Sequence, residues 1–337
     1  MLRTTHYRSA TGHRRSAAGP LFAIAIASLA ATSSEAAVVV NSAGFEPSAY
    51  TTGTLEGQQG WFNAGSGGAT AVVQTAVVKS GTQAVKLTRT SNSNRYFGRF
   101  VSSPPTGRYV SVDWDMRFEA TGSTTSYGPF FGVNGFFEGA GGAVGFGAGF
   151  GVDSSTRELL YQQGGTGNFV AGPIVPADTW AHYRIDFDFG SDTYKAYYNG
   201  TLIATTGFVD SHLGINRLTD IDIVALPAAG DAASMAQAGV AYFDNLVVRD
   251  GVRGDYNNDG IVNAADYTVW RDTQNQTGFG LAADGDADGV VGASDYQVWK
   301  AAYGASNAIG AAIAVPEPTA AGVLLTACFA AAFRRAR

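Results

Sequence analysis

Two stretches near the C-terminal end of the chain repeat one frame of acidic and amide residues. Residues 255 to 270 read DYNNDGIVNAADYTVW, and residues 284 to 299 read DGDADGVVGASDYQVW. Carboxylates placed this closely repel one another unless a positive charge lies among them. The repeat therefore predicts a cation site in each copy.

The spacing within each copy is that of a calcium loop, which takes oxygen ligands from positions 1, 3, 5, 7, 9 and 12 and has glycine at position 6. In the first loop the predicted ligands are Asp255, Asn257, Asp259, the carbonyl oxygen of Ile261, Asn263 and Asp266, with Gly260 at the turn. In the second they are Asp284, Asp286, Asp288, the carbonyl oxygen of Val290 and Asp295, with Gly289 at the turn. Gly292 stands at position 9 of the second loop and has no side-chain oxygen, so water is expected there. The prediction is two Ca²⁺ ions.

The residues around the loops predict a small helical module. Glycines precede each loop and exclude a helix there, whereas Tyr267 and Trp270 after the first loop, and Tyr296, Trp299 and Tyr303 after the second, recur at helical spacing. Val262 and Val291, at position 8, are expected to point into a core between paired loops. Because the carboxylates repel in the free chain, the module is predicted to be disordered without calcium.

This pair of loop-then-helix units resembles the type I dockerin domain, over residues 254–304. The resemblance implies calcium binding at the residues named above. It also implies a cohesin on another protein as partner, contacted from the positions that match the family's interface: Ala264, Ala265, Ala293, Ser294, Arg271 and Lys300. The Ser-Thr pair of many dockerins is absent here, which leaves the cohesin partner open. Thrombospondin-type calcium repeats are the alternative, and the missing cysteines and following helices disfavour them.

Strand signals dominate residues 37–252. Val112, Trp114 and Met116 alternate with Asp113 and Asp115, as in a half-buried strand. Asn199-Gly200 stands between two alternating runs and predicts a hairpin turn. Many short antiparallel strands predict a mainly β fold, namely a two-sheet antiparallel jelly-roll sandwich, with the calcium-loop module as a small α-helical addition.

Part of this body is similar to the laminin-G and concanavalin-A-like jelly rolls. The residues that carry the similarity are Trp180, Tyr183, Ile185, Tyr194, Tyr198, Asn199, Gly200 and Leu202. The resemblance implies the sandwich fold, whose members bind or cleave glycans or mediate adhesion, and so it leaves the function open.

Three acidic residues of the body are candidates for a catalytic pair. Asp113, Asp115 and Glu119 are the nearest candidates for the two carboxylates of a glycosidase. Arg117 stands among them, which favours a solvated strand face instead. His182 has no serine or cysteine partner at a recognisable elbow and is expected to be a surface or ligand-facing residue. No catalytic residue is predicted.

Glycines and aromatic residues in the body are compatible with a ligand-binding face but do not establish one. The glycine-rich residues 128–151 are expected to be tightly packed strands with bulges, the alternative being strands that admit a flat ligand such as a sugar ring. A stacking platform for sugar would need exposed aromatic side chains, for which the candidates are Trp61, Tyr96, Phe97 and Tyr127.

The charge distribution excludes nucleic acid as a partner. The formal net charge is −6, but seven of the 22 basic residues lie in the first 15 or last four positions. Between residues 37 and 318 there are 15 basic and 27 acidic residues, a net charge of −12. No basic footprint forms.

Both ends of the chain carry targeting signals. Residues 1–36 have the basic start, apolar core and small-residue end of a secretory signal peptide. After a linker over residues 305–314, residues 315–337 resemble the PEP-CTERM sorting signal: Pro316, Glu317 and Pro318, a short apolar run, then arginines. The resemblance implies processing by an exosortase after transient membrane anchoring. The alternative is a permanent tail anchor.

Together these features predict an exported, non-catalytic protein of the cell envelope or extracellular matrix. It would bind calcium through the dockerin-like loops and a carbohydrate or protein through the jelly roll. The alternative is a polysaccharide-degrading glycoside hydrolase, acting on O-glycosyl bonds, or its accessory subunit.

Overall fold

The computed structural model describes residues 38–101, 107–122, 126–138, 143–214, 217–278, 281–286 and 288–307. The predicted signal peptide, the sorting signal and most of the predicted linker lie outside these residues. Within the described residues, none of the helices has the length and apolar character needed to cross a bilayer.

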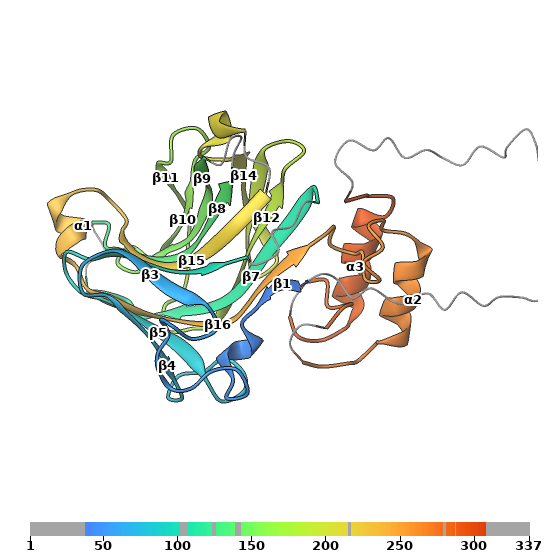
Figure 1. Cartoon of the computed structure of the whole chain (residues 1–337), viewed down its shortest axis with the longest axis horizontal. Coiled ribbons are helices and arrows are strands. Elements are labelled where there is room, and N and C mark those ends of the chain that lie inside the picture. The colour runs from blue at the N-terminus through green and yellow to red at the C-terminus, as the bar shows by residue number, and fades with distance from the viewer. Residues whose placement is uncertain are drawn as a thin grey trace, which may run out of the picture. The chain divides into compact units, whose positions relative to one another are not determined.

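Two antiparallel sheets form most of the described chain, as predicted (Figure 1). The nine-stranded sheet runs β14-β13-β12-β7-β16-β5-β4-β2, and β1 pairs with β16. Its strands are β1 (Val38–Asn41), β2 (Gly53–Thr54), β4 (Thr70–Gln74), β5 (Ala84–Arg89), β7 (Tyr109–Phe118), β12 (Ala181–Asp188), β13 (Thr193–Tyr198), β14 (Thr201–Gly207) and β16 (Gly239–Asp250). The seven-stranded sheet runs β11-β10-β9-β8-β15-β6-β3. Its strands are β3 (Trp61–Ser66), β6 (Asn94–Phe100), β8 (Pro129–Glu138), β9 (Val144–Asp153), β10 (Glu158–Gln162), β11 (Phe169–Ile174) and β15 (Arg217–Pro227).

The core lies between the two sheets because alternate residues of each strand point inward. In β7, Val112, Trp114 and Met116 are fully buried, as their spacing predicts. Trp114 stacks on Tyr183 of the neighbouring strand β12, with ring centroids 5.6 Å apart. One continuous cluster of buried apolar side chains joins both sheets. The sandwich is therefore held together by a conventional hydrophobic core.

Local turn chemistry agrees with the sequence at two places. Asn199 and Gly200 join β13 to β14 and have φ angles of 45° and 76°, the positive values of a type I′ turn. The glycine-rich stretch forms β8 and β9, which pair over their whole length with a bulge between Gly135 and Phe136. The prediction of tightly packed strands with a bulge is therefore confirmed for this stretch.

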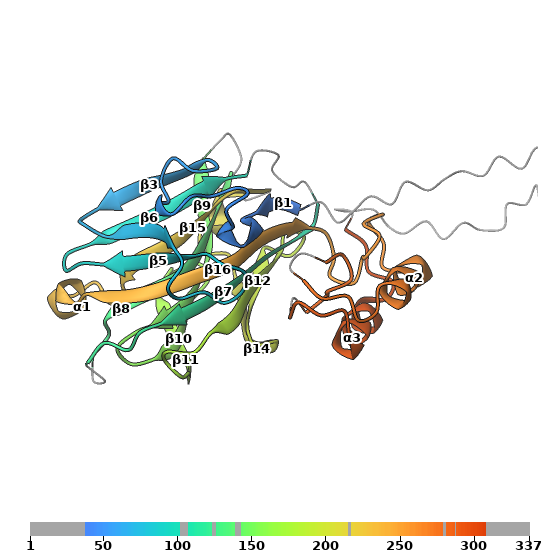
Figure 2. The same cartoon turned by 90° about the horizontal axis from the view of Figure 1, so that it is seen from below.

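Short helices complete the described chain. Two 3₁₀ turns, Ala43–Phe45 and Ser211–Leu213, and one short helix, α1 (Ala232–Ala236), lie within the sandwich. After β16, helices α2 (Ala264–Asp272) and α3 (Ala293–Ala302) each follow one of the two acidic loops. Figure 2 shows these two helices next to each other, and their aromatic side chains are in contact.

Candidate metal centre

The first acidic loop is organised by two buried carboxylates. Asp255 is 5% exposed and accepts hydrogen bonds from the backbone N–H groups of Asp259, at 3.1 Å, and Gly260, at 2.9 Å. Asp266 is fully buried and accepts from the N–H groups of Asn257, at 3.0 Å, and Asn263, at 2.7 Å. The first and last predicted ligands thus hold the backbone of the loop between them.

The second loop repeats this arrangement. Asp284 accepts from the N–H groups of Asp288, at 3.1 Å, and Gly289, at 3.0 Å. Asp295 is fully buried and accepts from the N–H groups of Asp286, at 3.1 Å, and Gly292, at 2.6 Å. Corresponding positions of the two loops therefore play the same part in the local structure, even though Gly292 replaces Asn263.

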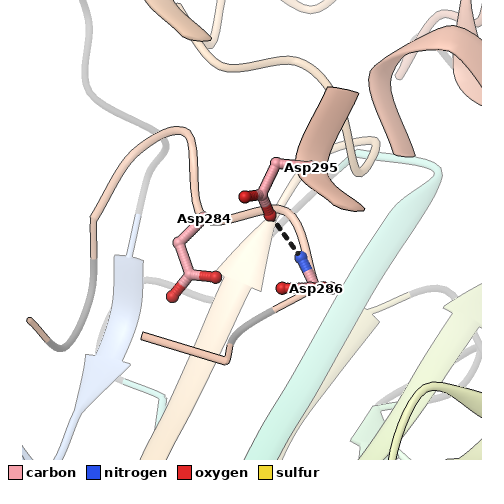
Figure 3. Close-up of side chains that lie close together, drawn as sticks. All are labelled: Asp284, Asp286 and Asp295. Atoms are coloured by element: carbon pink, nitrogen blue, oxygen red, sulfur yellow. Dashed lines mark hydrogen bonds between the residues drawn. The ribbon is translucent and has the colours of Figure 1, made fainter. Parts of the chain in front are cut away.

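Three predicted ligands of the second loop converge. One oxygen from each of Asp284, Asp286 and Asp295 lies within 4.8 Å of the other two, and Figure 3 shows these side chains gathered at one end of α3. Carboxylate oxygens at this separation fit around one divalent cation with ligand distances of about 2.4 Å. Asp288 and the carbonyl oxygen of Val290 belong to the same turn, where Asp288 accepts from the Val290 N–H at 2.8 Å.

The other predicted ligands of the first loop are also close together. Asn257 donates from its amide to Asp259 at 3.0 Å, and Asn263 donates to the carbonyl oxygen of Ile261 at 3.1 Å. Asp259 accepts a further, longer contact of 3.5 Å from Asn263. Side chains from positions 3, 5 and 9 and the carbonyl of position 7 therefore meet within one short loop.

Crowding of the carboxylates changes their titration. Burial, together with the charges of Asp266 and Asp259, raises the pKa of Asp255 to about 6. Burial, with Asp295 and the other acids of its loop, raises the pKa of Asp284 to about 7. Backbone N–H donors oppose both shifts only partly. Each loop thus concentrates negative charge that a cation would compensate.

Glycine at position 6 has the predicted conformation in both loops. Gly260 has φ +89° and Gly289 has φ +87°, a region that residues with a side chain rarely adopt. Val262 and Val291 are buried, whereas their neighbours Ile261 and Val290 are 43% and 41% exposed. The inward direction of position 8 is as expected.

The pairing of the loops differs from the expectation. Ile261 forms its bridge with Ser306, after α3, and Val290 forms its bridge with Thr277, after α2. Each loop therefore pairs with the segment that follows the helix of the other repeat, and not with the other loop. The helices are long enough to bring their following segments back along the opposite loop, which a spacing argument within one repeat does not reveal.

Aromatic side chains lock the two repeats together. Tyr267 and Trp270 of α2 contact Tyr296 and Trp299 of α3, with centroid distances of 5.1 Å for Trp270–Tyr296 and 5.4 Å for Tyr267–Trp299. These four rings line a hollow of about 370 Å³.

The six positions that match the cohesin-contacting residues of dockerins are all exposed: Ala264, Ala265, Ala293, Ser294, Arg271 and Lys300. The cohesin partner stays a prediction.

Two of the three candidate acids of the sandwich, Asp113 and Asp115, are buried, contrary to the expectation, whereas the side chain of Glu119 is 44% exposed. Asp113 is 1% exposed and Asp115 is 7% exposed. The imidazole of His182 lies between them, with Nε2 3.1 Å from Asp113 and Nδ1 3.3 Å from Asp115. His182 is half-buried, with 17% of its side chain exposed, and it forms an ion cluster with the two buried carboxylates. Its partners are on β7, two strand positions apart, and sequence alternation alone did not show that the outward face of β7 is covered.

Charge pairing explains the titration of this cluster. Burial alone would lower the pKa of His182, but the two carboxylates outweigh it and raise the pKa to about 9. Burial opposes ionisation of Asp113, yet Arg253, His182 and Arg249 hold its pKa well below the usual range. The raised pKa of His182 favours its protonated form at neutral pH, and a protonated imidazole does not accept a proton as a general base.

Two of the aromatic residues considered for a sugar platform are buried in the core. Trp61 is 2% exposed and Phe97 is 4% exposed. Tyr96 is half-buried and Tyr127 is 37% exposed. The four do not form one exposed platform, because Trp61 and Phe97 fall on the inward faces of β3 and β6.

Comparison with known proteins places the chain in no family. No family model matches it, and no curated protein matches it. Among solved structures, the chain is similar to the cellulose induced protein Cip1, with 18% identity and a TM-score of 0.41 over 59% of this chain and 96% of that one. It is also similar to an endo-β-1,4-glucuronan lyase from the fungus Trichoderma reesei, with 14% identity and a TM-score of 0.42 over 59% of this chain and 93% of that one. It is similar as well to the alginate lyase Aly36B, with 14% identity and a TM-score of 0.41 over 59% of this chain and 93% of that one. The functions named for these proteins are theirs.

Proposed function

We propose that the chain is an exported, non-catalytic protein of the cell surface or extracellular matrix that binds two calcium ions in a dockerin-like module. The proposal rests on the convergence of Asp284, Asp286 and Asp295 within 4.8 Å. The same backbone hydrogen bonds recur around Asp255 and Asp266 in the other loop. Similar backbone hydrogen bonds at the corresponding first and last ligand positions argue for the same ion in both loops.

The donor set fits a hard cation. Every predicted ligand is a carboxylate, amide or carbonyl oxygen, the donor type that calcium prefers. In the first loop the ion would be held by Asp255, Asn257, Asp259, the Ile261 carbonyl, Asn263 and Asp266. In the second it would be held by Asp284, Asp286, Asp288, the Val290 carbonyl and Asp295, with water at position 9. Bound calcium supplies the positive charge that lets these acids stay close, and its binding energy contributes to folding of the module.

Calorimetry with Ca²⁺ on the purified chain tests this proposal. The expected result is two ions per chain. Asp266→Asn and Asp295→Asn should each remove or greatly weaken one site, because the substitution removes a negative charge and one ligand oxygen. Asp272→Asn is the matched control, since this acid lies in the same module, is 63% exposed and is not a predicted ligand. Absence of calcium uptake, or equal effects of all three variants, would refute the proposal.

Location and partners follow from the two targeting signals and from the dockerin likeness. Export through the secretory pathway would be directed by residues 1–36, and an exosortase-type enzyme would process residues 315–337 after transient anchoring. A cohesin-like protein is the partner that the exposed faces of α2 and α3 would contact. Mass measurement of the secreted chain tests the two cleavages, and an uncleaved tail would favour the permanent anchor.

The hydrolase alternative would need two carboxylates free to face a substrate. Asp113 and Asp115 are held by His182, and Asp115 also accepts from the amide of Asn245 at 2.8 Å. This pair therefore does not supply the two free carboxylates that a hydrolase needs. Reducing-end release from a panel of polysaccharides would test catalysis directly, and turnover abolished by substitutions in the sandwich would replace our proposal with the alternative.

A further inference from the structure

A hollow of about 420 Å³ lies on the outward face of the nine-stranded sheet, where β7, β12 and β13 line it together with residues of α3. Its volume is within the range of small-molecule sites in proteins. Ile185 and Phe187 of β12 are buried in the core. Arg184 and Asp186 alternate with them and therefore have their side chains on the outward face, where both line the hollow. Lys195 of β13 pairs with Asp186, lines the hollow as well and is exposed, so a ligand can reach this space from solvent.

Arg184 is a buried charge that is incompletely paired. Only 10% of its side chain is exposed, and its guanidinium carbon lies 3.8 Å from the centroid of the Tyr197 ring. Its Nε lies 3.1 Å from Oδ1 of Asp186, but neither atom takes part in a hydrogen bond. Within the described residues, no other acid forms an ion pair with Arg184. The stacked ring therefore holds the guanidinium in place while its donors stay unfilled.

The atoms that remain unfilled and accessible belong to Arg184 and Asp186. The terminal nitrogens Nη1 and Nη2 of Arg184 and Oδ2 of Asp186 have no hydrogen-bond partner among the described residues, and they are not among the fully buried atoms of these side chains. Polar groups in so buried a setting are normally hydrogen-bonded, so they indicate a ligand that supplies both an acceptor and a donor. A guanidinium presents a planar fork of donors that matches a carboxylate. A hydroxyl group is a donor that an aspartate accepts.

Cationic side chains outnumber acidic ones around the hollow, three to two: Arg184, Lys195 and Arg253 against Asp186 and Asp188. Asp188 is already neutralised by Arg108, which donates to it from two nitrogens at 2.7 and 2.8 Å. Lys195 forms no ion pair within the described residues. The hollow thus keeps an uncompensated positive charge, although residues 37–318 carry a net charge of −12. An anionic ligand is favoured there.

Asp113 is the other acid placed to pair with Arg184, because the two residues are opposite each other on β7 and β12. Its carboxylate is occupied elsewhere. It accepts a hydrogen bond from Arg249 at 3.0 Å and another from Arg253, and it lies 3.1 Å from Nε2 of His182. The sandwich therefore does not supply the anion that the guanidinium of Arg184 lacks.

We propose that this hollow is the binding site of the sandwich for a sugar acid, that is, a uronate, either free or as a unit of a glycan. The carboxylate of the sugar accepts from the terminal nitrogens of Arg184, and a ring hydroxyl donates to Asp186. Lys195 stands diagonally across from Arg184, with Cα atoms about 7–8 Å apart, and adds a second cation beside the carboxylate. Val298 and Ala301 of α3 also line the hollow and supply apolar surface for the carbon skeleton of the sugar.

The same groups select against other ligands. A neutral sugar leaves the donors of Arg184 unmet and cannot use the charge of Lys195. Inorganic phosphate brings up to two negative charges beside the carboxylate of Asp186, and acetate has no hydroxyl to donate to it. The inference goes beyond calcium binding and holds whichever ion the two loops take.

Titration calorimetry on the full exported chain, kept in calcium, tests the inference with glucuronate and galacturonate. Glucose and galactose are the matched neutral sugars, and acetate and inorganic phosphate are anions without a sugar ring. We expect a uronate to bind in a single site and these four compounds to bind at least about tenfold more weakly, because each lacks the carboxylate or the sugar hydroxyls. Tighter binding of trigalacturonate than of galacturonate would identify a glycan as the source of the uronate, and equal affinity would identify the free sugar acid.

Substitutions assign the binding to this hollow. Arg184→Met should lower the affinity for the uronate at least about tenfold, the effect of losing hydrogen bonds between charged groups. Lys195→Met should lower it about three- to fivefold, because this cation is exposed and its ion pair is weaker. The exposure of Lys195 also means that its variant should fold like the wild type. Lys86→Met is the control, since this lysine is on β5 of the same sheet and outside the hollow, and its affinity should be unchanged.

Asp186→Asn gives a result that a purely structural role would not produce. The substitution removes the negative charge beside Arg184 but keeps an acceptor oxygen, so the affinity for inorganic phosphate should rise while the uronate still binds. The inference is overturned by a wild type that binds no uronate, by equal binding of glucose and glucuronate, or by unchanged affinity in both Arg184→Met and Lys195→Met. Calcium uptake measured on the same samples keeps such a result distinct from failure of the calcium proposal.

Discussion

Trp270 donates a hydrogen bond from its indole N–H to the carbonyl oxygen of Gly292, 2.7 Å away. The reciprocal contact joins Trp299 to the carbonyl oxygen of Asn263 at 2.8 Å. Gly292 and Asn263 occupy the same position in the two loops, immediately before α3 and α2. Each helix therefore fixes the loop of the other repeat, and the closing Asp-Tyr-x-Val-Trp of each copy has a structural reason.

Substitution of Trp270 by phenylalanine should weaken the second loop more than the first. The change keeps an aromatic ring but leaves the Gly292 carbonyl without its donor, at a cost of about 1 kcal/mol or more. That corresponds to roughly a fivefold loss of affinity for the second ion. Calorimetry on Trp270→Phe and Trp299→Phe checks this, since the two variants should affect opposite sites. Equal losses at both sites in each variant would contradict the cross-repeat coupling.

Removal of calcium should unfold the module and leave the sandwich intact. An ion present at 100 times its Kd stabilises the folded state by about 2.7 kcal/mol, and a chelator removes this contribution. The expected observation is loss of helical signal in the far-UV spectrum, together with rapid proteolysis confined to the module, residues 254–304. Because the sandwich core lies in another part of the chain, its strand signal should persist. Protease resistance unchanged by the chelator would contradict the prediction.

Replacement of Gly260 by alanine should weaken the first loop alone. At φ +89° a side chain is strained by about 1–2 kcal/mol, and the strain distorts the turn that carries ligands at positions 5 and 7. Gly289→Ala should weaken the second loop and leave the first unchanged. Gly230→Ala is the control, because no atom lies within 4 Å of its added Cβ. The outcome to be checked by calorimetry is one weakened and one unchanged site in each loop variant.

The stability of the sandwich should fall between about pH 6.5 and pH 9 through His182. Its pKa is raised to about 9 in the folded state, so it binds a proton more tightly there than in the unfolded chain, whose value is about 6.5. Its contribution is complete below pH 6.5 and is lost as the pH passes 9. Asp113 and Asp115 face the imidazole, and Arg249 and Arg253 lie beside Asp113.

Denaturant unfolding of wild type and His182→Gln isolates this effect, because Asp222 and Asp244 also titrate in the folded sandwich. Wild type should exceed the variant in free energy of unfolding at pH 6 by up to about 3 kcal/mol, the value of a shift of this size. The difference should shrink by pH 9.5. A difference independent of pH would mean that His182 contributes through packing and not through its charge.

Much of the local structure was predictable because it depends on neighbours in the chain. Asn199-Gly200 forms its hairpin, Gly260 and Gly289 adopt positive φ, and Val112, Trp114 and Met116 face the core. Each of these depends on backbone sterics or strand alternation within a few residues. The mainly β two-sheet fold followed from the same signals.

The amino-acid sequence alone determined the ligand spacing of each loop, the class of fold, and the concentration of negative charge that a cation would compensate. Only the tertiary structure decided what covers the outward faces of the strands. Strand alternation predicts that Asp113 and Asp115 are solvated, but His182 of the neighbouring strand β12 contacts both of them. Asp222 and Asn134 lie 88 positions apart in the chain and meet only because β15 pairs with β8. Strand alternation says which side a residue faces, whereas burial and hydrogen bonding depend on contacts between segments far apart in sequence, which no local spacing encodes.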